Sequence, residues 1–128
     1  MNADLLVKTL RWPVLSLLIV GGVHFVEEVV LPDLRNVFVP AVLGPLVLAF
    51  GIWTGYRAIR FGGNYADAAI AGAILGLLPV VVEYIGFGIL LDRGTDAGTL
   101  GAVFGWDMVF WGSLIGGGFA LGRTEPAT

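Results

Sequence analysis

Residues 12–31 read WPVLSLLIVGGVHFVEEVVL, an apolar stretch of 20 residues in which only His24, Glu27 and Glu28 can carry a charge. About 20 helical residues are needed to cross a hydrocarbon core roughly 30 Å thick, so this stretch predicts a transmembrane helix. The basic residues in front of it resemble the start of a signal peptide, but no small-x-small cleavage site interrupts the apolar run. We therefore expect the helix to be retained.

Three further apolar stretches follow along the chain, at 37–56, 66–91 and 98–121. Their hydrophobic residues are continuous rather than alternating, which favours helices over the strands of a membrane barrel. The polar segments between the four stretches are short and leave no room for a second domain. The sequence therefore predicts one all-α integral membrane domain over 1–128, a bundle of four transmembrane helices.

Composition agrees with a protein whose main partner is the lipid bilayer. Of the 128 residues, 57% are hydrophobic and only 13% are charged, whereas soluble domains have about a quarter charged residues. Lys and Arg together number only 7, which argues against a nucleic-acid partner. The absence of cysteine excludes disulfides, thiolate metal sites and cysteine nucleophiles.

Basic residues predict the direction in which the chain crosses the membrane. Five lie on one side of the predicted helices and two on the other: Lys8, Arg11, Arg57, Arg60 and Arg123 against Arg35 and Arg93. By the positive-inside rule, both termini are expected in the cytoplasm, with the chain in the inner membrane of a prokaryote. Aromatic residues predicted near the same interface would form an anchoring belt: Trp12, Trp53, Tyr56 and Tyr65.

The two halves of the chain share a faint pattern. AVLG at 41–44 and AVFG at 102–105 are each followed by two glycines at matching distances, and Gly21 precedes Glu28 by the spacing that separates Gly76 from Glu83. A parallel two-hairpin repeat would explain the pattern, and so would chance similarity between glycine-rich helices.

Glycines at four-residue spacing are typical of closely packed membrane helices. Such pairs include Gly51/Gly55, Gly72/Gly76, Gly101/Gly105, Gly112/Gly116 and Gly118/Gly122. We expect them to pack helices within one bundle, which also limits the size of any internal cavity.

Four acidic residues, Glu27, Glu28, Glu83 and Asp107, lie well inside the predicted helices, away from their ends, where no Lys or Arg accompanies them. An ionisable group near the middle of the bilayer costs roughly 2.5–3.5 kcal/mol or more, so these residues call for an explanation. His24, Glu83 and Asp107 all fall roughly 10–14 Å below the predicted outer helix ends, at 1.5 Å per residue. Together they predict a polar layer in the outer half of the membrane.

The first functional hypothesis is a small channel or transporter for protons or cations. Intramembrane carboxylates are a common device for coupling protons to a cationic substrate. The candidate ion-binding residues are His24, Glu27, Glu28, Glu83 and Asp107. Since Asp107 lies opposite the glycines of its helix, we expect it to face either a second neighbouring helix or another subunit, and the second alternative predicts a homodimer.

A second hypothesis is a metal site or an acid–base enzyme acting on a lipophilic substrate. His24 has carboxylates at i+3 and i+4, and a set made of His24, Glu27 and Glu83 would suit a divalent metal such as Mn, Fe or Zn. No nucleophile or phosphate-binding motif is recognisable, which weakens the case for an enzyme, and no other cofactor is expected.

Two less specific interpretations stay open. The chain could be a non-catalytic accessory subunit whose acids pair with basic residues of a larger membrane complex. The same groups also have purely structural roles available: His24 as a neutral core histidine, the paired glutamates as a wet helix end, and the deeper acids as protonated hydrogen-bonding groups.

The segment VHFVEEVVLP at 23–32 resembles the signature of the HXXEE-motif bacterial membrane proteins. His24, Glu27 and Glu28 match the histidine and the paired glutamates of that family. The likeness covers about ten residues. Because the function of these proteins is unknown, the resemblance implies an intramembrane polar site and supplies no reaction.

Overall fold

The computed structural model describes residues 2–90 and 95–123, leaving out the side chains of 35, 36, 87–90, 95–98 and 100. Within these ranges nearly all residues are helical, and no β-strand occurs. Three of the helices, Ala3–Val30, Val39–Arg60 and Tyr65–Gly86, are long and apolar enough to cross a membrane. These findings confirm the predicted all-α class and its membrane character.

The first helix, α1, spans Ala3–Val30 and begins well before the predicted start at residue 12. The Asn2 side chain caps it by accepting a hydrogen bond from the backbone N–H of Leu5 at 2.7 Å. The polar turns that this cap stabilises precede the apolar run, so hydropathy alone does not detect them. After α1, the short helices η1 (Pro32–Leu34) and α2 (Arg35–Phe38) reverse the chain.

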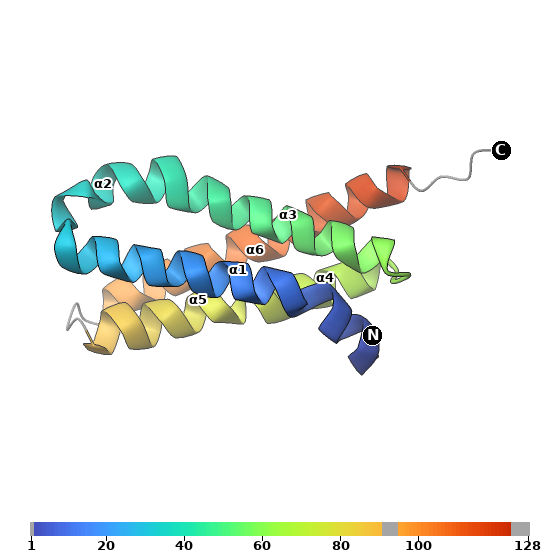
Figure 1. The fold of residues 1–128 in the computed structure, drawn as a ribbon, viewed down its shortest axis with the longest axis horizontal. Helices are drawn as coiled ribbons and strands as arrows, with labels where there is room; N and C mark the ends of the chain where they lie inside the picture. The colour runs from blue at the N-terminus through green and yellow to red at the C-terminus, as the bar shows by residue number, and fades with distance from the viewer. Residues whose placement is uncertain (1, 91–94, 124–128) are drawn as a thin grey trace.

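The chain returns along α1 through a π-helical turn, η2 (Val39–Leu43), and the helix α3 (Gly44–Arg60), as Figure 1 shows. A tight turn follows, in which Gly62 adopts φ of 99°, a conformation that favours glycine. Asn64 and Asp67 then form a reciprocal capping box that starts the next helix.

The third helical segment is interrupted rather than straight. It consists of α4 (Tyr65–Leu75), α5 (Leu77–Val81) and the π-helix η3 (Val82–Leu90). Gly76 separates the first two, and Pro79 lacks the N–H that an α-helix would donate to the carbonyl of Leu75, one turn earlier. The predicted end of this segment at residue 91 lies outside the described residues, as does Arg93.

The last helix, α6, spans Thr95–Arg123 and runs parallel to α3, so that the two termini lie at the same end of the molecule (Figure 1). The α3–α6 contact depends on glycine. A Cβ on Gly51 would lie 2.5 Å from the carbonyl oxygen of Val109, and one on Gly112 would lie 2.7 Å from that of Leu48.

One turn further along, the same contact repeats. A Cβ on Gly55 would clash with the carbonyl oxygen of Ser113, and one on Gly116 with that of Ile52. A shift of 61 positions relates the two helices: Gly112 of α6 corresponds to Gly51 of α3, and Val109 corresponds to Leu48. The contacts are reciprocal, because Gly51 meets Val109 while Gly112 meets Leu48. Of the predicted glycine pairs, Gly118/Gly122 is the exception, because a Cβ on Gly122 would meet nothing within 4 Å.

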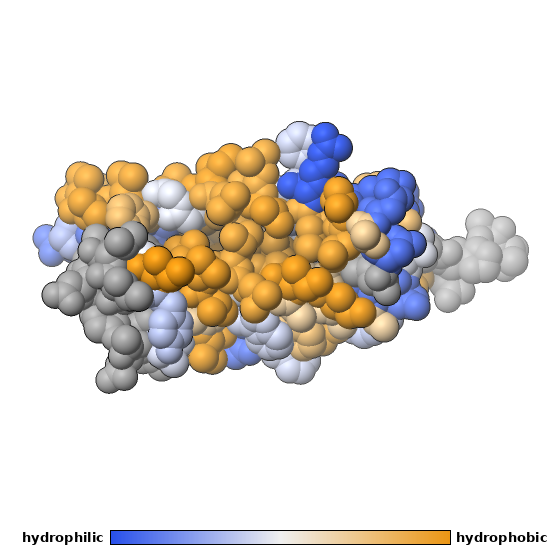
Figure 2. All heavy atoms as spheres, turned by 90° about the horizontal axis from the view of Figure 1, so that it is seen from below, coloured by the Kyte–Doolittle hydropathy of each residue, from blue (hydrophilic) through white to orange (hydrophobic). Residues whose placement is uncertain are grey.

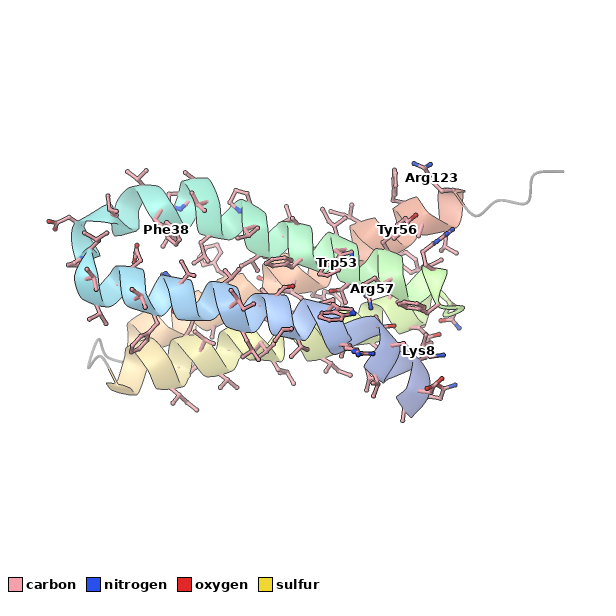
Figure 3. The ribbon with its side chains drawn as sticks, in the orientation of Figure 1. Lys8, Phe38, Trp53, Tyr56, Arg57 and Arg123 are labelled. Carbon is pink, nitrogen blue, oxygen red and sulfur yellow. The ribbon has the colours of Figure 1, made fainter. Side chains whose placement is uncertain are left out.

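On the face shown in Figure 2, the surface is mainly apolar around the middle of the molecule, and hydrophilic residues gather mainly at one end. That end carries the labelled basic and aromatic side chains of Figure 3, Lys8, Arg57, Arg123, Trp53 and Tyr56, whereas Phe38 lies at the other end. Large hydrophobic side chains such as Val7, Phe104 and Trp111 are more than half exposed. A lipid environment would cover them.

Candidate functional site

A pocket of about 620 Å³ lies between the helical segments, toward the end that carries Phe38. Residues of α1, of η2 and α3, of α5 and η3, and of α6 line it. Nearly all of them are apolar, and the ionisable side chains among them are His24, Glu28 and Glu83. No Lys or Arg belongs to the described lining.

Helix α1 supplies three of the candidate residues from one face. His24, Glu27 and Glu28 stand at i, i+3 and i+4, positions that are neighbours on a helix surface. Their relative solvent exposures are only 5%, 7% and 3%, respectively. One ligand atom from each lies within 4.8 Å of the others, so the three form a single buried cluster.

The imidazole of His24 connects α1 with the third helical segment. Its Nδ1 lies 3.9 Å from Oε2 of Glu27, and its Nε2 lies 3.7 Å from Oε1 of Glu83 on η3. The ring of Phe38 on α2 stacks on the imidazole, with the centroids 6.1 Å apart and the planes inclined by 13°. The histidine thus has a carboxylate at each ring nitrogen and an aromatic contact that orients the ring.

Among the residues of the cluster, Glu27 has the most buried oxygen atoms without a hydrogen bond. Both of its carboxylate oxygens are buried, and neither has a hydrogen-bond partner among the described residues. Burial of an ionised carboxylate without compensation is costly, so this side chain requires a counter-charge or a proton. The nearest described cationic candidate is His24, beyond hydrogen-bond distance.

Glu83 reaches the cluster from the beginning of η3. Its side chain retains 20% exposure and faces the pocket. A Cβ on Gly101 of α6 would lie 2.5 Å from Oε2 of Glu83, so this glycine makes the space that the carboxylate occupies. π-Helical turns occur frequently at functional sites, and here one carries Glu83 while the other, η2, lines the opposite wall of the pocket.

Asp107 does not join the other four candidates. It is half-buried and lines a separate pocket of about 290 Å³, together with Tyr84 and Trp106. It follows Gly101, the α6 residue level with Glu83, by six positions, or about 9 Å along the helix. The structure therefore brings together His24, Glu27, Glu28 and Glu83 and places Asp107 elsewhere.

Sequence reasoning missed two contributors, Phe38 and Gly101. The Gly101/Gly105 pair was a signal of close packing, but the sequence does not reveal that a carboxylate fills the space. The pocket also continues the pairing of α3 with α6. Every α6 residue in its lining has a counterpart in that lining 61 positions earlier: Pro40/Gly101, Leu43/Phe104, Gly44/Gly105 and Val47/Met108.

The resemblance around His24 stays a prediction. No known protein family, curated protein or solved structure matches this chain.

Proposed function

We propose that the protein is a small membrane transporter of cations that uses intramembrane carboxylates as its binding site. The observation that carries this proposal is the pocket shared by all the long helical segments, which is apolar except for His24, Glu28 and Glu83. Carboxylates in such an apolar pocket attract a cation, and their partial desolvation strengthens the attraction.

The size and lining of the pocket favour an organic cation with apolar groups over a bare ion. About 620 Å³ is within the range of small-molecule sites and far exceeds the volume of a metal ion. Apolar walls would bury the hydrophobic part of such a ligand while Glu83 meets its charge. Protonation of Glu83 would release the ligand, which couples cation movement to protons.

The proposal includes a four-helix transmembrane bundle with both termini in the cytoplasm of a prokaryote. Two observations support this topology: α6 is 29 residues long, and the termini lie at the same end. The basic side chains labelled in Figure 3 gather at that end, as the positive-inside rule requires of a cytoplasmic face.

We also propose that the two halves are a parallel repeat. The reciprocal glycine contacts of α3 and α6 support this. When a two-fold axis relates two helices, each contact between a residue of one helix and a residue of the other occurs a second time, between the corresponding residues. Glu28 and Glu83, the glutamates that the repeat would pair, meet in one pocket. Transporter sites commonly lie at such repeat interfaces.

A homodimer is a further part of the proposal. Asp107 supports it, because its half-buried carboxylate lines a pocket on the side of α6 away from the glycines and within a membrane segment. A second copy of the chain would cover this carboxylate.

The transport proposal is tested in proteoliposomes with tetraphenylphosphonium as the probe cation and an imposed pH gradient. We expect saturable, gradient-dependent uptake by the wild type and its loss in Glu83→Gln, since glutamine retains the shape and removes the charge. Asp107→Asn is the matched control: it neutralises a membrane carboxylate outside the pocket and should retain transport.

Uptake by Glu83→Gln at the wild-type rate would contradict the role of this carboxylate. Absence of flux for this probe and for inorganic monovalent cations, with correctly folded protein in the vesicles, would contradict transport itself.

A further inference from the structure

We propose that His24, Glu27 and Glu28 form a divalent-metal site on α1, with Glu83 holding the imidazole in place from η3. This site goes beyond the transport proposal, because it assigns the α1 cluster to a bound metal and leaves the rest of the pocket to another ligand. It can exist whether or not the protein transports anything.

The geometry of the cluster suits one ion. Two donors on opposite sides of a metal, each about 2.1 Å from it, are about 4.2 Å apart. The candidate atoms of His24, Glu27 and Glu28 all lie within 4.8 Å of one another. Side-chain movements of less than about 1 Å would therefore bring the three donors onto one ion, and the i, i+3, i+4 spacing on a continuous helix holds them on one face.

Glu27 gives independent evidence that a ligand belongs at this place. Its relative solvent exposure is only 7%, and both carboxylate oxygens lack hydrogen bonds from the described residues. A metal ion would satisfy these oxygens and, with its two positive charges, would neutralise Glu27 and Glu28 together.

The two nitrogens of His24 divide the roles. Nδ1 faces Glu27 and is the atom that would bind the metal, while Nε2 faces Glu83 at 3.7 Å. Metal-binding histidines almost always donate their second N–H to a carboxylate, a carbonyl or water, and this contact fixes the ring. From sequence we expected Glu83 as a ligand in place of Glu28; the structure instead favours Glu28 as ligand and Glu83 as a positioning residue.

The donor set narrows the identity of the metal. One imidazole nitrogen with two carboxylates, and no sulfur ligand in the whole chain apart from two methionines, favours Mn²⁺, Fe²⁺ or Zn²⁺ over soft metals.

The test is a titration of the purified protein in detergent with Mn²⁺, in which electron paramagnetic resonance measures the free ion. We expect one Mn²⁺ per chain in the wild type. Glu27→Gln and Glu28→Gln should each weaken binding at least 10-fold. Glu83→Gln should weaken it about 10-fold, because the amide oxygen is a weaker acceptor for the imidazole N–H than the carboxylate, with the stoichiometry retained. Asp107→Asn, a neutralised membrane carboxylate outside the cluster, should bind as the wild type does.

Folding of the variants is checked by their elution profiles and melting curves. Without metal, Glu27→Gln should be at least as stable as the wild type, because the amide removes an uncompensated buried charge. Wild-type binding that survives in both Glu27→Gln and Glu28→Gln would overturn the site, and so would the absence of binding to the wild type at millimolar Mn²⁺. Either result leaves the proteoliposome assay of transport unaffected, so the two proposals fail separately.

Discussion

Arg57 of α3 donates a hydrogen bond from Nε to the carbonyl oxygen of Thr9 on α1, at 3.1 Å. This is the carbonyl that an α-helix would pair with the N–H of residue 13, and Pro13 has none. A second bond, 2.7 Å long, joins Nη2 of Arg57 to the carbonyl of Lys8. The arginine thus supplies the donor that the proline lacks, and α1 continues through Pro13 while being tied to α3 (Figure 3).

Replacement of Arg57 by alanine should lower the free energy of unfolding by about 1.5–3 kcal/mol, the range for hydrogen bonds that involve a charged group. The cost should be smaller in a Pro13→Ala background, because alanine restores an N–H to the Thr9 carbonyl. Thermal unfolding in detergent of the four proteins of this double-mutant cycle measures the coupling.

Arg60→Ala is the control for this cycle. Arg60 lies in the same helical turn and makes a cation–π contact with Tyr56, with Cζ 5.9 Å from the ring centroid. Its loss should be nearly neutral and independent of Pro13. Equal costs of Arg57→Ala with and without Pro13 would show that the arginine does not compensate for the proline.

Gly101→Ala should impair the site without unfolding the protein. The new methyl group would meet the end of the flexible Glu83 side chain, with Oε2 at 2.5 Å and Cδ at 2.7 Å, and would push the carboxylate away from His24. We expect transport to fall as in Glu83→Gln, with the melting temperature changed by only a few degrees. Gly122→Ala, on the same helix with open space around it, should retain activity. Full activity of Gly101→Ala would show that the position of Glu83 is not critical.

The helical fold was predictable from the lengths of the apolar runs, but the helix ends were not. Hydropathy placed the first start at residue 12, whereas the cap at Asn2 starts α1 at Ala3. The number of apolar residues in a stretch also does not predict the π-helical turns. They arise where proline, at 40 and at 79, removes a backbone donor inside or just before them.

The site was predictable only as far as it is local. His24, Glu27 and Glu28 share a face because of helical spacing alone. The positions of Glu83 and Asp107 depend instead on the register between the third segment and α6, which close contacts such as Gly101 with Glu83 determine. Counting residues from the predicted helix ends places Asp107 level with Glu83, whereas in the structure it lies about 9 Å further along α6.

Asp107→Leu should separate a subunit contact from a lipid-facing carboxylate. If a second copy covers Asp107, the leucine removes a polar contact and should shift the protein toward monomer, as measured by light scattering in detergent. Phe119→Leu, a change at an exposed apolar position of α6 about 120° around the helix from Asp107, is the control for altered surface hydrophobicity. An oligomeric state that is the same in wild type and Asp107→Leu would count against the dimer.

The reciprocal glycine contacts of α3 and α6 predict that corresponding Gly→Ala substitutions on the two helices lower the stability of the protein by similar amounts. A methyl group at Gly55 meets the backbone of Ser113, and one at Gly116 meets the backbone of Ile52; neither backbone can yield without separation of the helices. Gly55→Ala and Gly116→Ala should therefore each lower stability by about 1–3 kcal/mol or more, the range for overpacking, and by similar amounts. Gly118→Ala is the control, because its Cβ would sit at an ordinary 3.7 Å from Tyr65. Melting curves of the three variants test the relation: strongly unequal costs at Gly55 and Gly116 would contradict a two-fold α3–α6 contact, and with it the main structural support for a repeat.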